Sequence, residues 1–263
     1  MTGLDGAALV TGGAQRLGRA MVLYLADRGV DVAIHYNSSR EAAEAVAEEA
    51  RGMGVRACTV QADLLSREET ARVVPEAAGG LGRPLSILIN NASIFEHDTI
   101  QTATWESWDR HVGSNLRAPY ELTQAFAAQA EKGARDANNE PVARNCVVNM
   151  VDMRVRKLTP EFSTYTIAKM GLWAMTVTAA QGLAPDVRVN AIGPGPTLKG
   201  ARQTERNFKT QRAATVLERG TDPGEICRTL GYILESPGLT GQLLCIDGGQ
   251  HLAWRTPDVL GVE

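Results

Sequence analysis

The chain has 263 residues, a formal net charge of −3 and 44% hydrophobic residues. This length can bury the core of one large α/β domain, and the slight negative charge argues against nucleic acid or an anionic membrane as the main partner. No apolar run reaches the ~18 residues that a membrane span needs. The four cysteines lie far apart and form no paired motif, so we expect reduced thiols and a cytoplasmic protein.

Short apolar runs alternate with helical patterns along the sequence. Strand-like runs occur at 7–11, 31–36, 55–63, 86–93, 144–150, 187–195 and 243–247. Helical patterns extend to residue 28, over about 40–52, 66–79, 105–132 and 222–235, and onward from residue 160. Near-continuous apolar strands between helices indicate a parallel sheet that is covered on both faces. We therefore predict one domain, residues 1–263, with a doubly wound α/β Rossmann fold built on a single seven-stranded parallel sheet.

The first strand-like run ends in a glycine-rich turn, TGGAQRLG at positions 11–18, that opens a helix. Glycines let the backbone approach a pyrophosphate, and a helix N-terminus supplies free N–H groups and the positive end of a dipole. Arg16 adds a cation at a place where small residues are commoner. A glycine turn between a strand and a helix therefore predicts a dinucleotide site.

The end of the second run distinguishes NAD from NADP. An NAD site places a carboxylate there to bind the ribose diol, but this end has no acid, and Asp31 lies at the other end. Hydroxyls, an imidazole and arginines suit a 2′-phosphate, so we predict NADP(H) as the cofactor. The residues expected at this phosphate are His35, Tyr36, Asn37, Ser38 and Ser39. Asp63, after the third run, could accept a hydrogen bond from the adenine amino group or cap the next helix.

Tyr165 and Lys169 are four residues apart in the helical stretch that starts near Pro160, so their side chains lie on one face. Ser163 and Thr164 could cap this helix. A phenol has a reference pKa near ~10, and an ammonium beside it favours the phenolate and lowers that pKa. The pair therefore indicates general acid–base catalysis.

A proline inside the long helical pattern marks a second candidate feature. Pro119 lacks the N–H that would bond to the carbonyl of Asn115, so we expect that carbonyl to be free and the helix to kink. A free carbonyl beside the Tyr/Lys pair could hold a water and extend a proton relay. A purely structural kink would leave the same pattern in the sequence.

Together these motifs resemble the short-chain dehydrogenase/reductase family along nearly the whole chain. The matching stretches are the glycine turn, NNA at 90–92, Asn115, Tyr165-x-x-x-Lys169, PG at 194–195 and DGG at 247–249. The resemblance implies that Tyr165 donates or accepts the proton, Lys169 lowers its pKa and binds the nicotinamide ribose, and Asn115 supports a water relay. The implied cofactor contacts are Gly12, Arg16, Leu17, Gly18, Asp63, Leu64, Asn91, Ala92, Ser93, Tyr165, Lys169, Pro194, Gly195 and Thr197. It also implies a homotetramer, in which Trp254 or Arg255 could reach a neighbour's site.

Asp152 departs from the family pattern. A serine usually stands thirteen residues before the tyrosine and polarises the substrate carbonyl, but this chain has Asp152 there. A carboxylate cannot donate a hydrogen bond unless it is protonated. It can accept from a substrate N–H, or pair with Tyr165 to hold and pass a proton. The substitution therefore favours a heterocycle containing C=N over a simple ketone.

With Asp152 and several other features, the sequence resembles one branch of this family, the pteridine reductases and dihydromonapterin reductases. The matching features are Arg16, HY at 35–36 with Ser39, NASIF at 91–95, NMVD at 149–152 and GPG at 193–195. In that branch the phenylalanine equivalent to Phe95 stacks on the flat pterin, and Ser93 and Arg16 contact it. The substrate residues expected here are Arg16, Ser93, Phe95, Asp152 and Tyr165.

The sequence thus predicts an NADPH-dependent reductase of a pterin or dihydropterin, with Tyr165 as the proton donor. The alternatives are a carbonyl reductase of a 3-oxoacyl thioester, sugar or small ketone, or a regulator that binds NADP(H) without turnover. The basic run at 154–157 could meet an acidic substrate tail or be solvated, and a loop at about 196–220 is expected to shape substrate choice. Histidine and cysteine spacings do not match a metal site, so no metal is expected.

Overall fold

The computed structural model describes residues 6–200 and 202–256. Its main sheet has the order β3-β2-β1-β4-β7-β8-β9, and each neighbouring pair is parallel. The strands are β1 (Ala7–Val10), β2 (Asp31–Tyr36), β3 (Ala57–Gln61), β4 (Ile87–Asn90), β7 (Asn145–Met150), β8 (Val187–Pro194) and β9 (Leu243–Ile246). The predicted doubly wound fold with seven parallel strands is confirmed.

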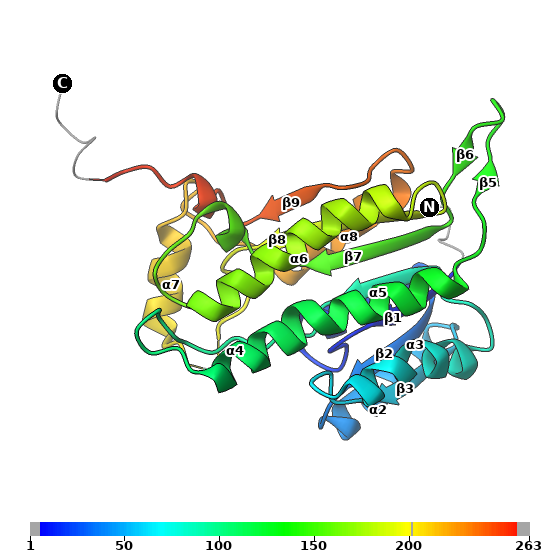
Figure 1. Ribbon diagram of the computed structural model, residues 1–263, viewed down its shortest axis with the longest axis horizontal. Helices are drawn as coiled ribbons and strands as arrows, with labels where there is room; N and C mark the ends of the chain where they lie inside the picture. The colour runs from blue at the N-terminus through cyan, green and yellow to red at the C-terminus, as the bar shows by residue number, and fades with distance from the viewer. Residues whose placement is uncertain (1–5, 201, 257–263) are drawn as a thin grey trace.

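Helices cover both faces of this sheet (Figure 1). They are α1 (Arg16–Ala26), α2 (Arg40–Gly52), α3 (Arg67–Leu81), α4 (Trp105–Val112), α5 (Ala118–Gln129), α6 (Ser163–Gly182), α7 (Glu205–Ala213) and α8 (Pro223–Glu235). Side chains of α1, α2 and α8 form one apolar core with the sheet, and those of α3, α5 and α6 form a second core on its other face. Along β1, Ala8 and Val10 belong to the first core and Ala7 and Leu9 to the second. Burial on both faces explains why the strands are continuously apolar.

The strand register brings polar segments to one edge of the sheet. Asn90 of β4 lies opposite Asn149 of β7, which lies opposite Ala191 of β8. The order of strands along the chain reverses between β1 and β4. Ligands on open α/β sheets bind at such a switch point, outside the carboxyl ends of the strands. The segments that follow β1, β4, β7 and β8 therefore meet where a ligand is expected.

Three regions differ from the sequence prediction. The helical pattern predicted over 105–132 is divided into α4 and α5 by a π-helical segment, Gly113–Arg117, just before Pro119. The polar region predicted as a loop after residue 196 contains α7, none of whose residues is buried. A helix without a buried face lacks the apolar period by which helices are recognised. A short hairpin of β5 (Ala134–Arg135) and β6 (Pro141–Val142) also precedes β7 and was not predicted.

The four cysteines are free thiols, of which Cys146 and Cys227 are buried. Burial raises the pKa of Cys146 to about 11, so this thiol stays protonated at neutral pH. Among the helices of the described residues, none is both long and apolar enough to cross a membrane.

Candidate active site

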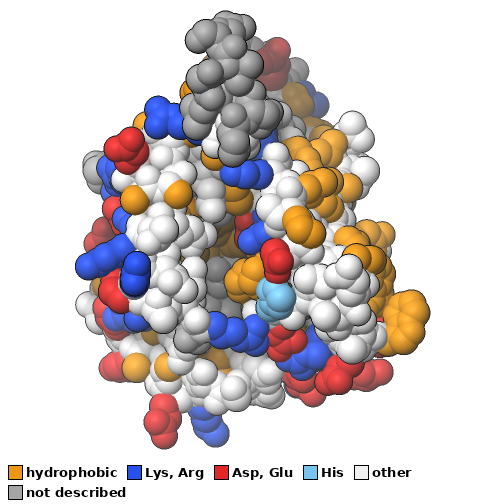
Figure 2. All heavy atoms as spheres, turned by 90° about the vertical axis from the view of Figure 1, so that its left-hand side faces the viewer, with side chains coloured by type: hydrophobic (Ala, Val, Ile, Leu, Met, Phe, Trp, Pro, Cys, Tyr) orange, Lys and Arg blue, Asp and Glu red, His pale blue; other side chains and the backbone are white. Residues whose placement is uncertain are grey.

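A cleft opens at the carboxyl edge of the sheet, beside the switch point, with a volume of about 750 Å³. The glycine turn, the segments after β4, β7 and β8, and α7 all contribute to its walls. Figure 2 shows the hollow with lysine and arginine side chains around its rim. Several residues expected at the site line it, namely Arg16, Phe95, Asp152, Pro194 and Gly195.

Three of the four predicted catalytic residues lie together at the base of the cleft, where Asp152 lines the cavity and Tyr165 and Lys169 are buried behind it; we call this region the floor. The Tyr165 hydroxyl donates a hydrogen bond to Oδ2 of Asp152 at 2.9 Å. The other carboxylate oxygen of Asp152 accepts the backbone N–H of Arg154 at 2.8 Å. One turn along α6 from Tyr165, the buried Lys169 donates from Nζ to the Met150 carbonyl at 2.7 Å. The tyrosine is therefore poised as a donor, with a carboxylate fixed beside it.

Burial sets the protonation of this group. It raises the pKa of Tyr165 well above 10, and the negative charge of Asp152 raises it further. Burial also raises the pKa of Asp152, and it lowers the pKa of Lys169 to about 8 against the favourable charge of Asp152. Burial and the neighbouring carboxylate together outweigh any opposing charge and leave the pKa of Tyr165 raised, so the lowering of that pKa by Lys169 stays a prediction. Tyr165 is thus a protonated acid at neutral pH.

A residue from the β4–α4 segment, Asp98, caps the catalytic helix. Its carbonyl accepts the backbone N–H of Phe162 at 2.7 Å, and its carboxylate accepts the backbone N–H of Thr164 at 3.1 Å and the Thr164 hydroxyl. Phe162 is the N-cap residue, with a left-handed φ of 59°, and makes no side-chain capping bond. The prediction that Ser163 and Thr164 cap the helix is therefore wrong. Asp98 lies 66 positions before Thr164, so the residues around the start of α6 do not indicate that Asp98 caps this helix.

The glycine turn has the shape that a dinucleotide needs. Gly12 adopts a left-handed φ of 61°, and its carbonyl lies where a Cβ on Gly18 would stand. The turn is tied to the segment after β4, because the Thr11 hydroxyl accepts the backbone N–H of Asn91 at 2.9 Å. The first turn of α1 has no side-chain cap and no acidic residue, so its N–H groups can receive a phosphate.

His35 has a different role from the predicted one. Its Nδ1 accepts the backbone N–H of Gly12 at 3.1 Å, which assigns the ring proton to Nε2, 3.0 Å from the Ala62 carbonyl. Burial lowers the pKa of His35 to about 4, so the imidazole is neutral at neutral pH. It therefore supports the glycine turn and offers no positive charge to a 2′-phosphate.

The other residues predicted at the cofactor, after β2 and β3, are partly accessible to a 2′-phosphate. Asn37 and Ser38 are exposed, and the Ser39 hydroxyl accepts from Gln15 Nε2 at 3.4 Å. Tyr36, which was also expected there, is buried. The Asp63 carboxylate accepts the N–H of Leu65 at 2.9 Å, whereas Ser66 caps α3. The capping role considered for Asp63 is thus wrong, and its adenine contact stays a prediction.

Asn115 lies in the π-helical segment and is fully buried. Its side chain accepts the N–H of Ile94 at 2.9 Å and donates to the Ile94 carbonyl at 2.8 Å. This pair of bonds fixes the irregular segment after β4 that carries Ser93 and Phe95. π-Helical turns inside α-helices are frequent at functional sites. The water relay through the Asn115 carbonyl stays a prediction.

Phe95 forms an aromatic wall of the cleft. Its ring is half exposed, lies 4.7 Å from the Tyr165 ring edge-on, and stacks at 4.3 Å on Phe162. The exposed part of Phe95 is available to a flat ligand close to the proton donor. Sequence reasoning identified Phe95 but missed Phe162, whose place depends on the helix cap described above.

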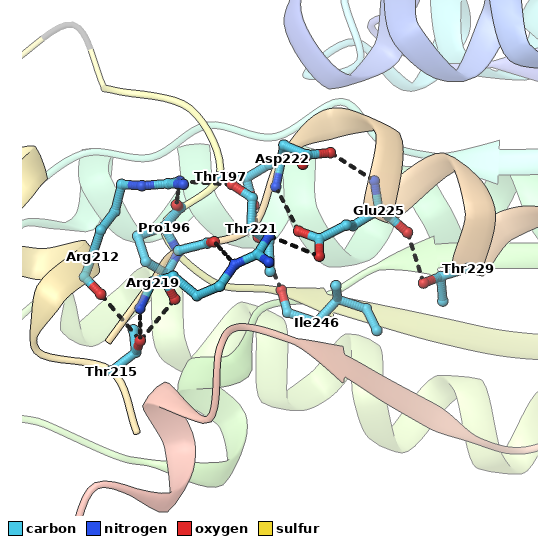
Figure 3. Close-up of polar contacts among 11 residues, drawn as sticks. Pro196, Thr197, Arg212, Thr215, Arg219, Thr221, Asp222, Glu225, Thr229 and Ile246 are labelled. Carbon is cyan, nitrogen blue, oxygen red and sulfur yellow. Dashed lines mark hydrogen bonds and ion pairs between the residues drawn. The ribbon is translucent and has the colours of Figure 1, made fainter. Parts of the chain in front are cut away.

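The substrate loop, which follows β8, contributes Pro196, Leu198 and Phe208 to the lining of the cleft. At its base the hydroxyls of Thr197 and Thr221 are 2.8 Å apart. Arg212 of α7 donates from Nη1 to the carbonyls of Pro196 at 2.8 Å and Thr221 at 2.7 Å. Figure 3 shows this arginine joining the start and the end of the loop. Across the cleft, Arg16 donates to the Lys199 carbonyl at 3.0 Å.

Comparisons with known proteins agree with this geometry. A profile of the family described as Enoyl-(Acyl carrier protein) reductase matches residues 12–251. The short-chain dehydrogenase/reductase FrzI of Cladobotryum sp is 32% identical, over 94% of this chain and 96% of its own length. The 3-oxoacyl-[acyl-carrier-protein] reductase FabG of Staphylococcus epidermidis is 26% identical, over 95% of this chain and 100% of its own.

A solved structure is more similar still in sequence. The FolM alternative dihydrofolate reductase 1 of Brucella canis, crystallised with NADP, is 40% identical. It superposes with a TM-score of 0.88 and covers 99% of this chain and 100% of its own. The similarity thus extends over the sheet, the cleft and the substrate loop.

Proposed function

This chain belongs to the short-chain dehydrogenase/reductase family, and we propose that it uses NADPH to reduce a ring C=N bond of a pterin or dihydropterin. The observation that carries the proposal is the hydrogen bond from Tyr165 to Asp152 beside the exposed Phe95 ring. A flat heterocycle can stack on that ring while its nitrogen atoms face a proton donor and an acceptor. The similarity to a dihydrofolate reductase supports the same substrate class.

NADP(H) is the cofactor that fits the residues present. The free N–H groups at the start of α1 would receive the diphosphate, with Arg16 as a counter-charge. Asn37, Ser38 and Ser39 would hold the 2′-phosphate, since no carboxylate stands at the end of β2. The NADP-bound structure of the Brucella relative supports this choice. When bound, the nicotinamide supplies the hydride.

The proton step belongs to this chain's own residues. Tyr165 gives its hydroxyl proton to a ring nitrogen as the neighbouring ring carbon receives the hydride. Lys169, when protonated, stabilises the resulting phenolate. Burial raises the pKa of Asp152, so this carboxyl can carry the proton that restores Tyr165. We propose Asn115 as the backbone support of a water path that refills Asp152.

A second candidate, reduction of a 3-oxoacyl thioester, is favoured by the similarity to the FabG reductase. That reaction needs a hydrogen-bond donor at the substrate carbonyl, as well as the tyrosine. In this arrangement both oxygens of Asp152 act as acceptors, Oδ2 from the Tyr165 hydroxyl and Oδ1 from the N–H of Arg154, so the carboxyl is not placed to donate to a substrate carbonyl. The site geometry therefore favours the pterin.

The test is NADPH consumption with 7,8-dihydrobiopterin or dihydromonapterin, beside acetoacetyl thioester and a panel of ketones. We expect turnover of the dihydropterins and little of the others, with NADH a much poorer reductant than NADPH. Turnover of the thioester or ketones with silent pterins would refute the proposed substrate. The homotetramer, and a contact of Trp254 or Arg255 with a neighbour's site, stay predictions.

A further inference from the structure

The fold places the three cationic side chains of the basic run at 154–157 in different surroundings. Arg154 lines the cleft. Arg156 donates from Nη2 to the Leu243 carbonyl at 3.4 Å and lines a separate groove that also contains Glu225. Lys157 donates to the Gln250 carbonyl at 3.4 Å. Of these three cations, Arg154 is the one that a bound substrate can meet.

The Arg154 side chain packs against the aromatic residues that form one wall of the cleft. Its guanidinium carbon lies 4.9 Å from the centre of the Phe162 ring, and Nη1 donates to the Thr159 hydroxyl at 2.7 Å. Phe162 stacks in turn on Phe95. The guanidinium thus packs against Phe162, the ring that neighbours Phe95, on which we propose that the pterin stacks. Its Nε is buried and has no hydrogen-bond partner among the described residues.

The cleft lining carries more positive than negative charge. Its arginines are Arg154, Arg202 and Arg16, the last of which we assign to the cofactor diphosphate; none of them forms an ion pair within residues 6–200 and 202–256. The single carboxylate of the lining, Asp152, is engaged by Tyr165 and by a backbone N–H. Elsewhere arginines such as Arg19 do have carboxylate partners. Unpaired guanidinium groups in a cleft attract an anionic ligand.

We propose that Arg154 determines specificity by binding an anionic group, a carboxylate or a phosphate, on the side chain of the substrate. Arg202 supplies a second cation in the same cleft. The proposal rests on the dihydropterin function, because it places the heterocycle on Phe95 and the substituent towards Phe162 and Arg154. A cleft of about 750 Å³ has the size used by ligands larger than a bicyclic ring.

The experiment compares dihydropterins that share the ring and differ in the side chain. One carries a neutral dihydroxypropyl group, one the same kind of chain with a phosphate, and one a p-aminobenzoylglutamate group with carboxylates. In the wild type we expect kcat/KM for an anionic compound to exceed that for the neutral one by about tenfold or more. Arg154→Gln should remove that advantage. Because the ring and the hydride step are shared, the ratio isolates the side-chain contact.

Arg156→Gln is the matched control, since it removes the same charge two residues away in a different groove. It should keep the wild-type ratio. Equal kcat/KM for neutral and anionic compounds in the wild type would overturn the proposed role of Arg154. So would an advantage of the anionic compounds that survives Arg154→Gln. Either result would leave the dihydropterin function standing. Absence of turnover with all three compounds would refute the dihydropterin function itself. The phosphate and carboxylate compounds show which anion is preferred, and a preference for either one that depends on Arg154 supports the proposal.

Discussion

The floor of the cleft and the substrate loop are built in opposite ways. The floor sits on the central strands and on α6, where Tyr165 and Lys169 are 5% and 2% exposed. The loop, residues 196–221, leaves the sheet after β8, and its helix α7 contains no buried residue. Sheet hydrogen bonds and apolar packing fix the floor, whereas the loop is held largely by side-chain hydrogen bonds, such as those of Arg212 and of the Thr197–Thr221 pair.

This difference assigns separate tasks to the two regions. A buried floor holds the proton donor, the carboxylate and the ammonium in one geometry, which general acid catalysis requires. A loop that is held largely by side-chain hydrogen bonds, and whose helix α7 buries no residue, opens at a lower free energy than the core. Substitutions in the floor should therefore change kcat or stability, and substitutions in the loop should change KM.

The largest effect is expected from Tyr165→Phe, in the floor. The variant keeps the ring that contacts Phe95 but loses the hydroxyl that bonds to Asp152. We expect kcat/KM for a dihydropterin to fall by about 10³-fold, because general acid catalysis commonly contributes this much. NADPH binding, measured by fluorescence titration, should change little. Retention of more than about a tenth of the activity would mean that another group delivers the proton.

His35→Gln tests how much the buried imidazole that supports the glycine turn contributes to the free energy of unfolding. The pKa of His35 is about 4 in the fold against ~6.5 unfolded, so the unfolded chain takes up the proton first. The stability tied to neutral His35 is complete above pH ~6.5 and is lost as pH falls towards 4, by about 3 kcal/mol in all. We expect the variant to be less stable at pH 7 but to lose less stability on acidification. Urea unfolding at pH 7 and pH 5 measures this. The same acid loss in variant and wild type would contradict it.

Asp152→Ser should lower kcat/KM for dihydropterins by about tenfold and alter the pH profile. Burial lowers the pKa of Lys169 to about 8, and the charge of Asp152 opposes that lowering. Without the carboxylate the pKa of Lys169 falls further, so the loss of activity at alkaline pH should begin at a lower pH. Asp152→Asn, which keeps the shape without the charge, should move the alkaline limb in the same direction. Unchanged pterin turnover, or an unmoved limb in both variants, would show that the carboxylate has no catalytic part.

The sequence predicted the floor well because its signals are local or repeat with a fixed period. The seven apolar runs, the glycine turn and the spacing from Tyr165 to Lys169 each follow from a short stretch of chain. It missed features that depend on contacts between distant segments. Asp98 caps a helix that starts 65 positions later, and His35 turns inward because Gly12 offers it an N–H. The helix in the loop was missed because no apolar face marks it.

The smallest effect is expected from Arg212→Met, in the loop. Methionine keeps an apolar stem near Phe208, whose ring lies 5.4 Å from the Arg212 guanidinium carbon, but removes the donors to the Pro196 and Thr221 carbonyls. The cleft wall formed by Phe208 would then be less well fixed, so we expect KM for the dihydropterin to rise about threefold to tenfold.

In the same variant kcat and the melting temperature should change little, because among the residues that the structure describes no floor residue bonds to Arg212, and α7 buries no side chain. Hydrogen exchange should quicken in residues 196–221 and remain unchanged in α6. Arg206→Met, on the exposed surface of the same helix, is the matched control and should keep the wild-type KM. A fall in kcat as large as the rise in KM would mean that the loop helps to place the proton donor. In that case the floor and the loop would act as one unit, and the separation between chemistry and substrate selection would not hold.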